Sequence, residues 1–348
     1  MSKIKLAKKD FESLVDTLIS ETKVYGPMTE PNKPDRFNFE PLTSHVDLRL
    51  DYDVTLRTLR RFFVPPVEAI VSYDMKGGYK SVYNDQPFIL LGVHPYDMIA
   101  INQLDALFAQ DNYDTHYFAH RNNATIIASD VLKASKDVFA SSMKTATVHS
   151  GYDILLTDIG DGYILDAATE KGENILKLAK NASAPNEADL QKRQQLWDYN
   201  KKNLNKHPLK CSPSYLAKLL DKGYKHPIWE ELAKKCFSCG SCNQVCPTCY
   251  CFHVRDDASW DMTNGIRRRS WDGCLLDGFT KVAPDHEFRK KRADRIRHRI
   301  HRKGKYVPAK IGVDTACIGC GRCVSACLTD IANPVKIYNR LIDDLGIE

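Results

Sequence analysis

Residues 236–247 read Cys-Phe-Ser-Cys-Gly-Ser-Cys-Asn-Gln-Val-Cys-Pro, and residues 317–328 read Cys-Ile-Gly-Cys-Gly-Arg-Cys-Val-Ser-Ala-Cys-Leu. Both stretches repeat one spacing, in which two residues separate each of the first three cysteines and three residues precede the fourth. One tight loop can direct the first three sulfurs toward a single iron–sulfur cluster, whereas the fourth cysteine ligates the other cluster when two such runs are paired. The repeat therefore predicts two [4Fe–4S] clusters with crossed ligation.

Crossed ligation gives each cluster three cysteines from one run and the last cysteine of the other run. The first cluster would be held by Cys236, Cys239, Cys242 and Cys327. The second cluster would be held by Cys317, Cys320, Cys323 and Cys246. Structural zinc usually takes its ligands from two separated pairs, so a triple with two-residue gaps favours clusters over zinc.

Length and composition place the chain among ordinary globular proteins. Its 348 residues suffice for two domains, and its apolar and charged fractions of 43% and 27% are typical of soluble chains. No apolar run is long enough to span a membrane, so no transmembrane segment is expected. Residues 1–22 are Lys-rich and lack the apolar core and cleavage site of a secretory signal. We therefore expect a cytoplasmic protein of an anaerobe, without disulfides.

The positive charge is smaller than the formal value suggests. The chain carries +6, but two clusters with their thiolates contribute about −2 each and leave roughly +2. The basic stretch 289–305, and Arg267–Arg269 before it, could form a solvated face, bind nucleic acid, or act electrostatically on the clusters or on an acidic partner such as ferredoxin. No nucleic-acid-reading module accompanies these residues, so a nucleic-acid partner is not expected.

The periodicity of apolar residues predicts an α+β or α/β domain over residues 1–204. We expect a helical connection over 205–235, and then a domain like that of bacterial two-cluster ferredoxins over 236–348, with a long insertion over 252–316. Pro27, Pro31 and Pro34 indicate an irregular connection. The expected helices lie at about 8–21, 98–107, 169–180 and 187–204, and the expected strands at 88–93 and 125–128 with a hairpin over 153–166.

Further metal ligands could lie in the insertion. Three cysteines outside the two runs, with an aspartate and a histidine, could hold a third [4Fe–4S] cluster: Cys249, Cys251, Cys274, and either Asp272 or His286. The alternative is that these cysteines are small buried apolar residues without a ligand role. Spacing alone leaves both interpretations open.

The same stretches resemble a known family. Residues 236–252, 269–274 and 317–331 are similar to the beta subunit of cytoplasmic sulfhydrogenases and equally to the electron-transfer subunit of the anaerobic sulfite reductase. Residues 62–66 and 91–97 resemble the N-terminal domain of that family. The resemblance retains all five candidate third-cluster positions, which favours that cluster. Leu328 stands where the family usually has proline, and Tyr96 where it commonly has cysteine.

The resemblance implies a subunit that carries electrons. Its expected partners are a flavin subunit that handles NAD(P)H and a catalytic subunit of hydrogenase or sulfite-reductase type. The chain has no dinucleotide fingerprint after a strand, no Walker A loop and no hydrolase nucleophile motif, so no catalytic residue is predicted. The alternative hypothesis is a catalytic iron–sulfur subunit that binds substrate at an open iron of a third cluster.

Overall fold

A seven-stranded mixed sheet forms the centre of the N-terminal half of the protein, whose computed structural model describes residues 2–347. The strand order is β1-β9-β8-β7-β6-β2-β3, and the strands are β1 (Lys3–Ala7), β2 (Lys23–Glu30), β3 (Lys33–Pro41), β6 (Phe88–Val93), β7 (Ala124–Ser129), β8 (Ile154–Asp158) and β9 (Gly162–Ala167). Strands β2, β6, β7 and β8 run parallel to one another, whereas β1, β3 and β9 pair antiparallel. The expected mixed α/β character is confirmed.

Both faces of this sheet are buried, which explains its nearly uninterrupted apolar strands. Along β6, Ile89 and Leu91 face the core that contains helix α1 (Lys8–Glu21), whereas Leu90 and Val93 face the core that contains α2 (Pro95–Phe108). The remaining helices of this half are α3 (Thr115–Asn123), α4 (Glu170–Leu176) and α5 (Glu187–Asn203), and two short 3-10 turns are η1 (His45–Asp47) and η2 (Leu59–Phe62). The expected strand over 88–93 and helix over 8–21 are confirmed.

The irregular connection expected at Pro27, Pro31 and Pro34 is wrong. Pro27 lies within β2, Pro34 lies within β3, and the two strands form an antiparallel hairpin around Pro31. Proline is tolerated where its missing N–H would face no neighbour. Strand β3 is at the sheet edge, and β2 pairs with β6 only from Lys23 to Tyr25.

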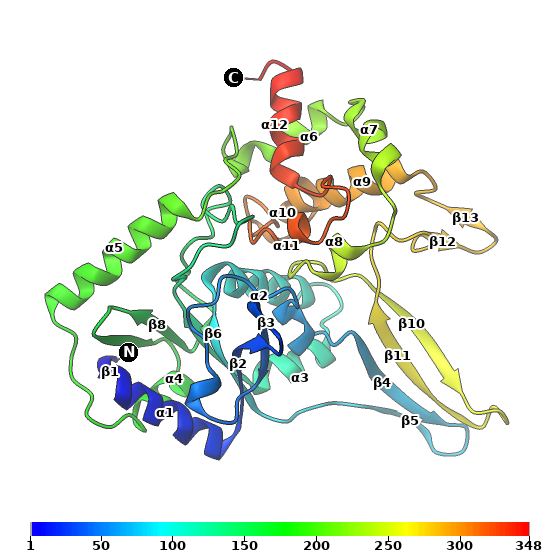
Figure 1. Cartoon of the computed structure of the whole chain (residues 1–348). Coiled ribbons are helices and arrows are strands. Elements are labelled where there is room, and N and C mark those ends of the chain that lie inside the picture. The colour runs from blue at the N-terminus through cyan, green and yellow to red at the C-terminus, as the bar shows by residue number, and fades with distance from the viewer. Residues whose placement is uncertain (1, 348) are drawn as a thin grey trace.

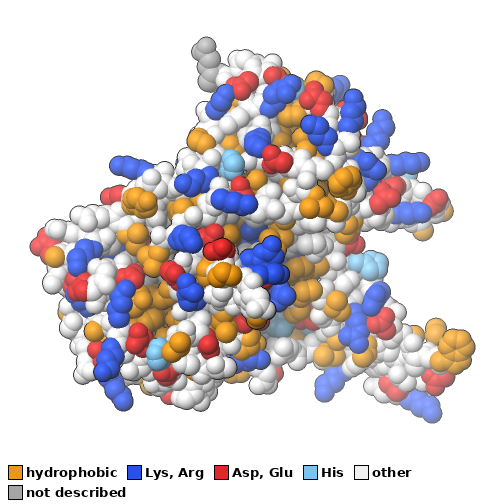
Figure 2. All heavy atoms as spheres, in the orientation of Figure 1, with side chains coloured by type: hydrophobic (Ala, Val, Ile, Leu, Met, Phe, Trp, Pro, Cys, Tyr) orange, Lys and Arg blue, Asp and Glu red, His pale blue; other side chains and the backbone are white. Residues whose placement is uncertain are grey.

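A second sheet projects from the body as an arm (Figure 1). Its order is β10-β11-β4-β5, with β10 (Phe252–Ala258), β11 (Asn264–Trp271), β4 (Val67–Asp74) and β5 (Gly78–Ser81). The sheet therefore joins the N-terminal half to the segment expected as an insertion, across the predicted domain boundary. Apolar side chains gather at its free end (Figure 2), where Trp260, Met262 and Met75 are exposed.

Short helices make up most of the C-terminal part. They are α6 (Leu216–Lys222), α7 (Ile228–Lys235), α8 (Ser241–Gln244), α9 (Arg292–His301), α10 (Val307–Ile311), α11 (Arg322–Ser325) and α12 (Pro334–Asp344). A 3-10 turn η3 (Pro213–Tyr215) precedes α6, a π-helical turn η4 (Arg302–Tyr306) continues α9, and a small hairpin consists of β12 (Lys281–Val282) and β13 (His286–Glu287). Among the residues described, no helix is both long and apolar enough to cross a membrane. The division into domains stays a prediction.

Candidate metal centres

The two cysteine runs adopt matching backbone conformations. Ser238 and Gly240 have positive φ angles of 54° and 72° in the first run, and Gly319 and Gly321 have 68° and 80° at the equivalent positions of the second. Each loop then enters a one-turn helix, α8 or α11. Because left-handed residues at these two positions coil the loop tightly, its first three cysteines can point inward together. The Ser238 N–H donates to the Cys236 sulfur at 3.4 Å.

The cysteines predicted for the first cluster line one cavity, cavity 1. Its walls include all four of them, together with apolar side chains such as Ile296 and Ile337: Cys236, Cys239, Cys242 and Cys327. Burial raises the pKa of Cys242 to about 12, so this thiol becomes charged chiefly by binding a metal. The Ser241 hydroxyl, by contrast, lowers the pKa of Cys239, which is exposed.

The cysteines predicted for the second cluster line a separate cavity, cavity 2. The four are Cys317, Cys320, Cys323 and Cys246. None of them is exposed, and burial raises the pKa of Cys320 to about 12. Sulfurs at the corners of a cubane are held apart by its inorganic core, so they need not converge on one point. Consistently, no group of three His, Cys, Asp or Glu in residues 2–347 is placed to hold a single metal ion. Each cavity is lined by four cysteines, the donor set that a [4Fe–4S] cluster takes.

Arg299 of α9 lies between the two cavities and lines both. Its side chain is buried, with 6% of the residue exposed, and its Nη1 donates a long hydrogen bond of 3.4 Å to the Ala332 carbonyl. Within the described chain its Nε has no hydrogen-bond partner. Burial lowers the pKa of Arg299, but Cys242 and Cys323 more than reverse this effect, and the guanidinium stays charged. Its natural counter-charges are the sulfur groups on either side.

Replacing Arg299 with methionine should lower the reduction potentials of both clusters. A buried positive charge beside an anionic cluster favours the reduced state, because net charge is one determinant of cluster potential. We expect the equilibrium constant for reduction of each cluster to fall at least about tenfold, which lowers the potential by about 59 mV for a one-electron couple. EPR-monitored redox titration measures the reduction potential of each cluster. Arg299→Lys should stay close to the wild type, and Arg340→Met, which removes an exposed arginine from α12, is the matched control.

Lys303 supplies a second buried charge beside cavity 2. Its Nζ donates to the Thr248 carbonyl at 2.9 Å and to the Thr248 hydroxyl at 2.6 Å. The pKa of Cys246 is well below its usual range because the Cys249 thiol donates to it, and Lys303 lowers this pKa further against the effect of burial. The basic stretch 289–305 is therefore not a purely solvated face. Arg295, Arg299 and Lys303 are all buried, at helical spacing.

The structure brings together three of the five residues considered for a third cluster. The buried Asn243 side chain donates through its Nδ2 to Cys249 at 3.6 Å and to Cys274 at 3.4 Å. Cys251 is half-buried beside them: burial raises its pKa, Arg302 lowers it, and Cys274 raises it. Three sulfurs and nearby cations thus lie next to cavity 2.

The remaining two candidates are placed differently. The N–H of Asp272 donates to the Cys251 carbonyl at 3.1 Å, and its carboxylate accepts the Gly273 N–H at 2.7 Å. His286 is exposed on β13, where its ring contacts the Phe288 ring edge-on at 4.8 Å. Of the two, Asp272 is therefore the better candidate for a fourth ligand.

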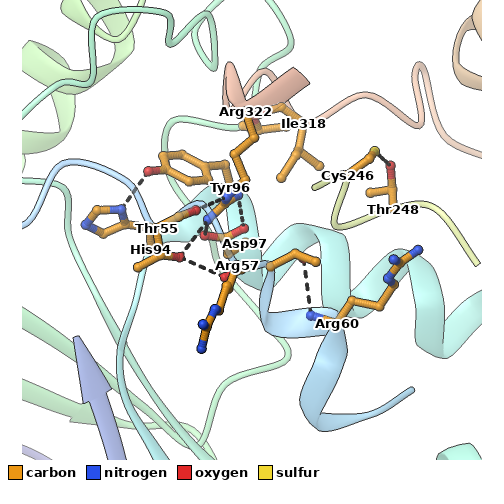
Figure 3. A network of polar contacts seen from close by, with 12 residues as sticks. Thr55, Arg57, Arg60, His94, Tyr96, Asp97, Cys246, Thr248, Ile318 and Arg322 are labelled. Atoms are coloured by element: carbon orange, nitrogen blue, oxygen red, sulfur yellow. Dashed lines mark hydrogen bonds and ion pairs between the residues drawn. The ribbon is translucent and has the colours of Figure 1, made fainter. Parts of the chain in front are cut away.

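Side chains from the N-terminal half hold these loops in place (Figure 3). Arg322, which follows Gly321 in the second run, forms a buried bidentate ion pair with Asp97 at 2.6 and 2.7 Å. It also donates to Thr55. Arg60 donates to the Cys249 carbonyl and, at 3.3 Å, to the Gln244 carbonyl, and it stacks on Trp271 with its Cζ 3.6 Å from the ring centre.

These supporting residues were not predicted from the sequence. Arg299 and Lys303 lie in a basic stretch that Ile296 and Ile300 interrupt at helical spacing. This spacing is the only feature of the stretch that indicates a buried side. For Arg60, Asp97 and Arg322 the sequence contains no comparable signal, because their partners are far away along the chain.

Adjacent cavities, each lined by three cysteines of one run and one of the other, are the arrangement expected of a domain that holds two iron–sulfur clusters. In agreement, residues 235–331 match the family of 4Fe-4S dicluster domains, which supports two [4Fe–4S] clusters. The chain is 29% identical to Sulfhydrogenase 2 subunit beta of Pyrococcus furiosus. The alignment spans 346 residues, which are 99% of this chain and 100% of that protein. The predicted resemblance to sulfhydrogenase beta subunits is thus confirmed. The likeness to the anaerobic sulfite reductase stays a prediction.

Proposed function

We propose that the chain is the iron–sulfur electron-transfer subunit of a cytoplasmic oxidoreductase with several subunits. In this role it relays electrons between a flavin subunit that handles NAD(P)H and a catalytic subunit of hydrogenase or sulfite-reductase type. The observation that carries the proposal is the pair of adjacent cysteine-lined cavities that share Arg299. Adjacent clusters in one buried environment can pass an electron between them without binding a substrate.

Each part of the site has a task in this proposal. The eight cysteines of cavities 1 and 2 would hold the clusters, which supply one-electron redox chemistry when bound. Arg299 and Lys303 provide positive charge within the low-dielectric interior, where it acts strongly on neighbouring anions. The Asp97–Arg322 ion pair fixes the loop of the second run on helix α2. The exposed apolar end of the arm is a feature of surfaces that contact other proteins.

The isolated chain should be redox-active but should not turn over substrates. Purified anaerobically, it should give EPR signals of reduced [4Fe–4S] clusters, and it should neither consume hydrogen nor reduce sulfite. The native assembly, isolated through a tag on this chain, should contain a flavin subunit and regain turnover. Turnover by the chain alone would contradict the proposal and would support the alternative of a catalytic iron–sulfur subunit.

We also propose a third [4Fe–4S] cluster, held by Cys249, Cys251 and Cys274 with Asp272 as the fourth ligand. Asn243 already bridges two of these sulfurs, and nearby Arg302 and Lys303 would offset the added negative charge. A carboxylate ligand would change the potential of this cluster relative to its neighbours.

Iron counting tests the third cluster. The chain should bind about twelve irons, and Cys274→Ala should reduce this number to about eight while the EPR signals of the other two clusters remain. Cys211→Ala is the control, because Cys211 is half-buried outside both cavities. A wild-type count of about eight irons would rule out the third cluster and leave the dicluster proposal intact.

A further inference from the structure

The two cavities differ in how close they come to the surface. Cys239 of cavity 1 is the exposed one among the twelve cysteines, whereas the cysteines of cavity 2 are buried or half-buried. Two large apolar side chains at the walls of cavity 1 are also exposed: Phe237, with 68% of the residue accessible, and Leu328, with 86%. Each directly follows a cysteine of the predicted cluster, and one comes from each run.

The packing of the folded chain does not account for these two apolar side chains. A side chain exposed by 86% gains little from burial in the folded chain, so its stabilising contribution there is small. Leu328 follows the last cysteine of the second run, at the position that Pro247 occupies in the first run. Contiguous apolar groups rimmed by polar ones mark sites of protein contact.

The rim of this apolar surface is basic. A groove next to cavity 1 shares Ile331 and Ile337 with it. Three cations and two carboxylates line the groove: Lys235, Lys336, Arg340, Glu231 and Asp330. Lys336 is paired with Asp330 at 2.8 Å and Arg340 with Asp344, so the basic character comes from Lys235, which forms no ion pair among the described residues. Lys234 is also exposed in the last turn of α7. A partner with complementary charge would be acidic.

We infer that Phe237, Leu328 and the adjoining basic groove form the docking surface for an acidic redox protein that exchanges electrons at cavity 1. This inference rests on the proposed function. In each encounter one electron leaves the reduced carrier and is accepted at cavity 1, so the carrier is oxidised by one electron and the chain is reduced by one. Because electron-transfer rates fall steeply with distance, the cavity that reaches the surface is the point of exchange. Cavity 2 then lies one step further inside.

The test measures how fast a reduced carrier reduces the cluster-loaded chain. The probe is a small acidic [4Fe–4S] ferredoxin, mixed with the full chain in an anaerobic stopped-flow instrument. The Phe237→Ser/Leu328→Ser double variant should lower the second-order rate constant at least about tenfold, because two central apolar contacts are lost. Lys234→Glu/Lys235→Glu should lower the rate at low salt and weaken its dependence on ionic strength.

Matched controls separate docking from other effects. Val46→Ser/Leu132→Ser removes two exposed apolar side chains from the N-terminal half, and Lys201→Glu/Lys202→Glu reverses an exposed lysine pair of α5. Both should react at the wild-type rate. Reduction by dithionite, a small reagent that needs no docking surface, should be equal in the wild type and in the two serine double variants, which leave the charge unchanged.

Two outcomes would overturn the inference. One is a wild-type rate for the Phe237→Ser/Leu328→Ser variant with full iron content, and the other is a comparable loss in Trp260→Ser, which would place docking on the arm. A wild-type chain without clusters would contradict the proposed function instead, so the two failures can be told apart by iron content and EPR.

Discussion

The Cys236→Ala/Cys327→Ala double variant should lose about four irons per chain, whereas Cys236→Ala/Cys246→Ala should lose about eight. The reason is crossed ligation. Cys236 and Cys327 line cavity 1 together, so both changes in the first variant damage one cluster. Cys246 lines cavity 2, so the second variant damages both clusters.

The comparison of these variants is informative because each removes two cysteines. If each run instead held its own cluster, the outcome would be reversed: Cys236→Ala/Cys246→Ala would lose about four irons and Cys236→Ala/Cys327→Ala would lose about eight. Iron is counted after anaerobic purification, and EPR spin quantification of the reduced samples gives an independent measure. Cys211→Ala serves as the control for the loss of a cysteine outside the two cavities. Equal losses in the two double variants would contradict crossed ligation.

A further set of variants addresses substitution of a lost ligand by a neighbour. The Cys249 thiol is hydrogen-bonded to Cys246 and could replace it in the Cys246 variants. The triple variant Cys236→Ala/Cys246→Ala/Cys249→Ala removes this possibility. Because Cys249 is also a proposed ligand of the third cluster, the comparison is with Cys236→Ala/Cys246→Ala/Cys274→Ala, which removes a third-cluster ligand but keeps Cys249. A larger iron loss in the Cys249 variant than in the Cys274 variant would identify Cys249 as the substitute.

The two cysteine sets were predicted from local spacing, and each set lines one cavity of the structure. Two-residue gaps limit which sulfurs one loop can direct inward, and the repetition of the run implies pairing. Strand β6 and helix α1 were predicted for a similar reason, since an apolar run and a three-four spacing are visible within a dozen residues. Both kinds of signal depend on neighbouring residues alone.

The arm could not be predicted in the same way. Strand β4 reads Val67-Glu68-Ala69-Ile70, and its residues are half-buried or exposed without alternation, so its apolar pattern is weak. Its pairing with β11 brings Val67 opposite Ser270, a contact between segments that are remote in sequence. Likewise, the basic stretch 289–305 left open which arginine would be buried, because the cysteines that flank Arg299 come from segments remote in the sequence.

Asp97→Asn should destabilise the folded protein by about 3–5 kcal/mol, the usual cost of removing one partner of a buried ion pair. Asp97 and Arg322 each have a side chain only 1% exposed, and the guanidinium would remain charged in an apolar environment with one partner fewer. Burial lowers the pKa of Arg322, but Asp97 and Cys320 more than reverse this effect. Urea unfolding under anaerobic conditions, followed by tryptophan fluorescence, measures the change.

A surface aspartate provides the control for the destabilisation expected of Asp97→Asn. Asp343→Asn breaks an ion pair with Lys210 whose side chains are both about half exposed, and it should cost less than about 1 kcal/mol. Asp97→Asn/Arg322→Met removes both charges, so it should be less destabilising than the sum of its single changes. If Asp97→Asn unfolded at the same urea concentration as Asp343→Asn, the ion pair would not be what fixes the second cysteine loop on helix α2. Because that loop carries three cysteines of cavity 2, a loosened loop should also lose its iron first.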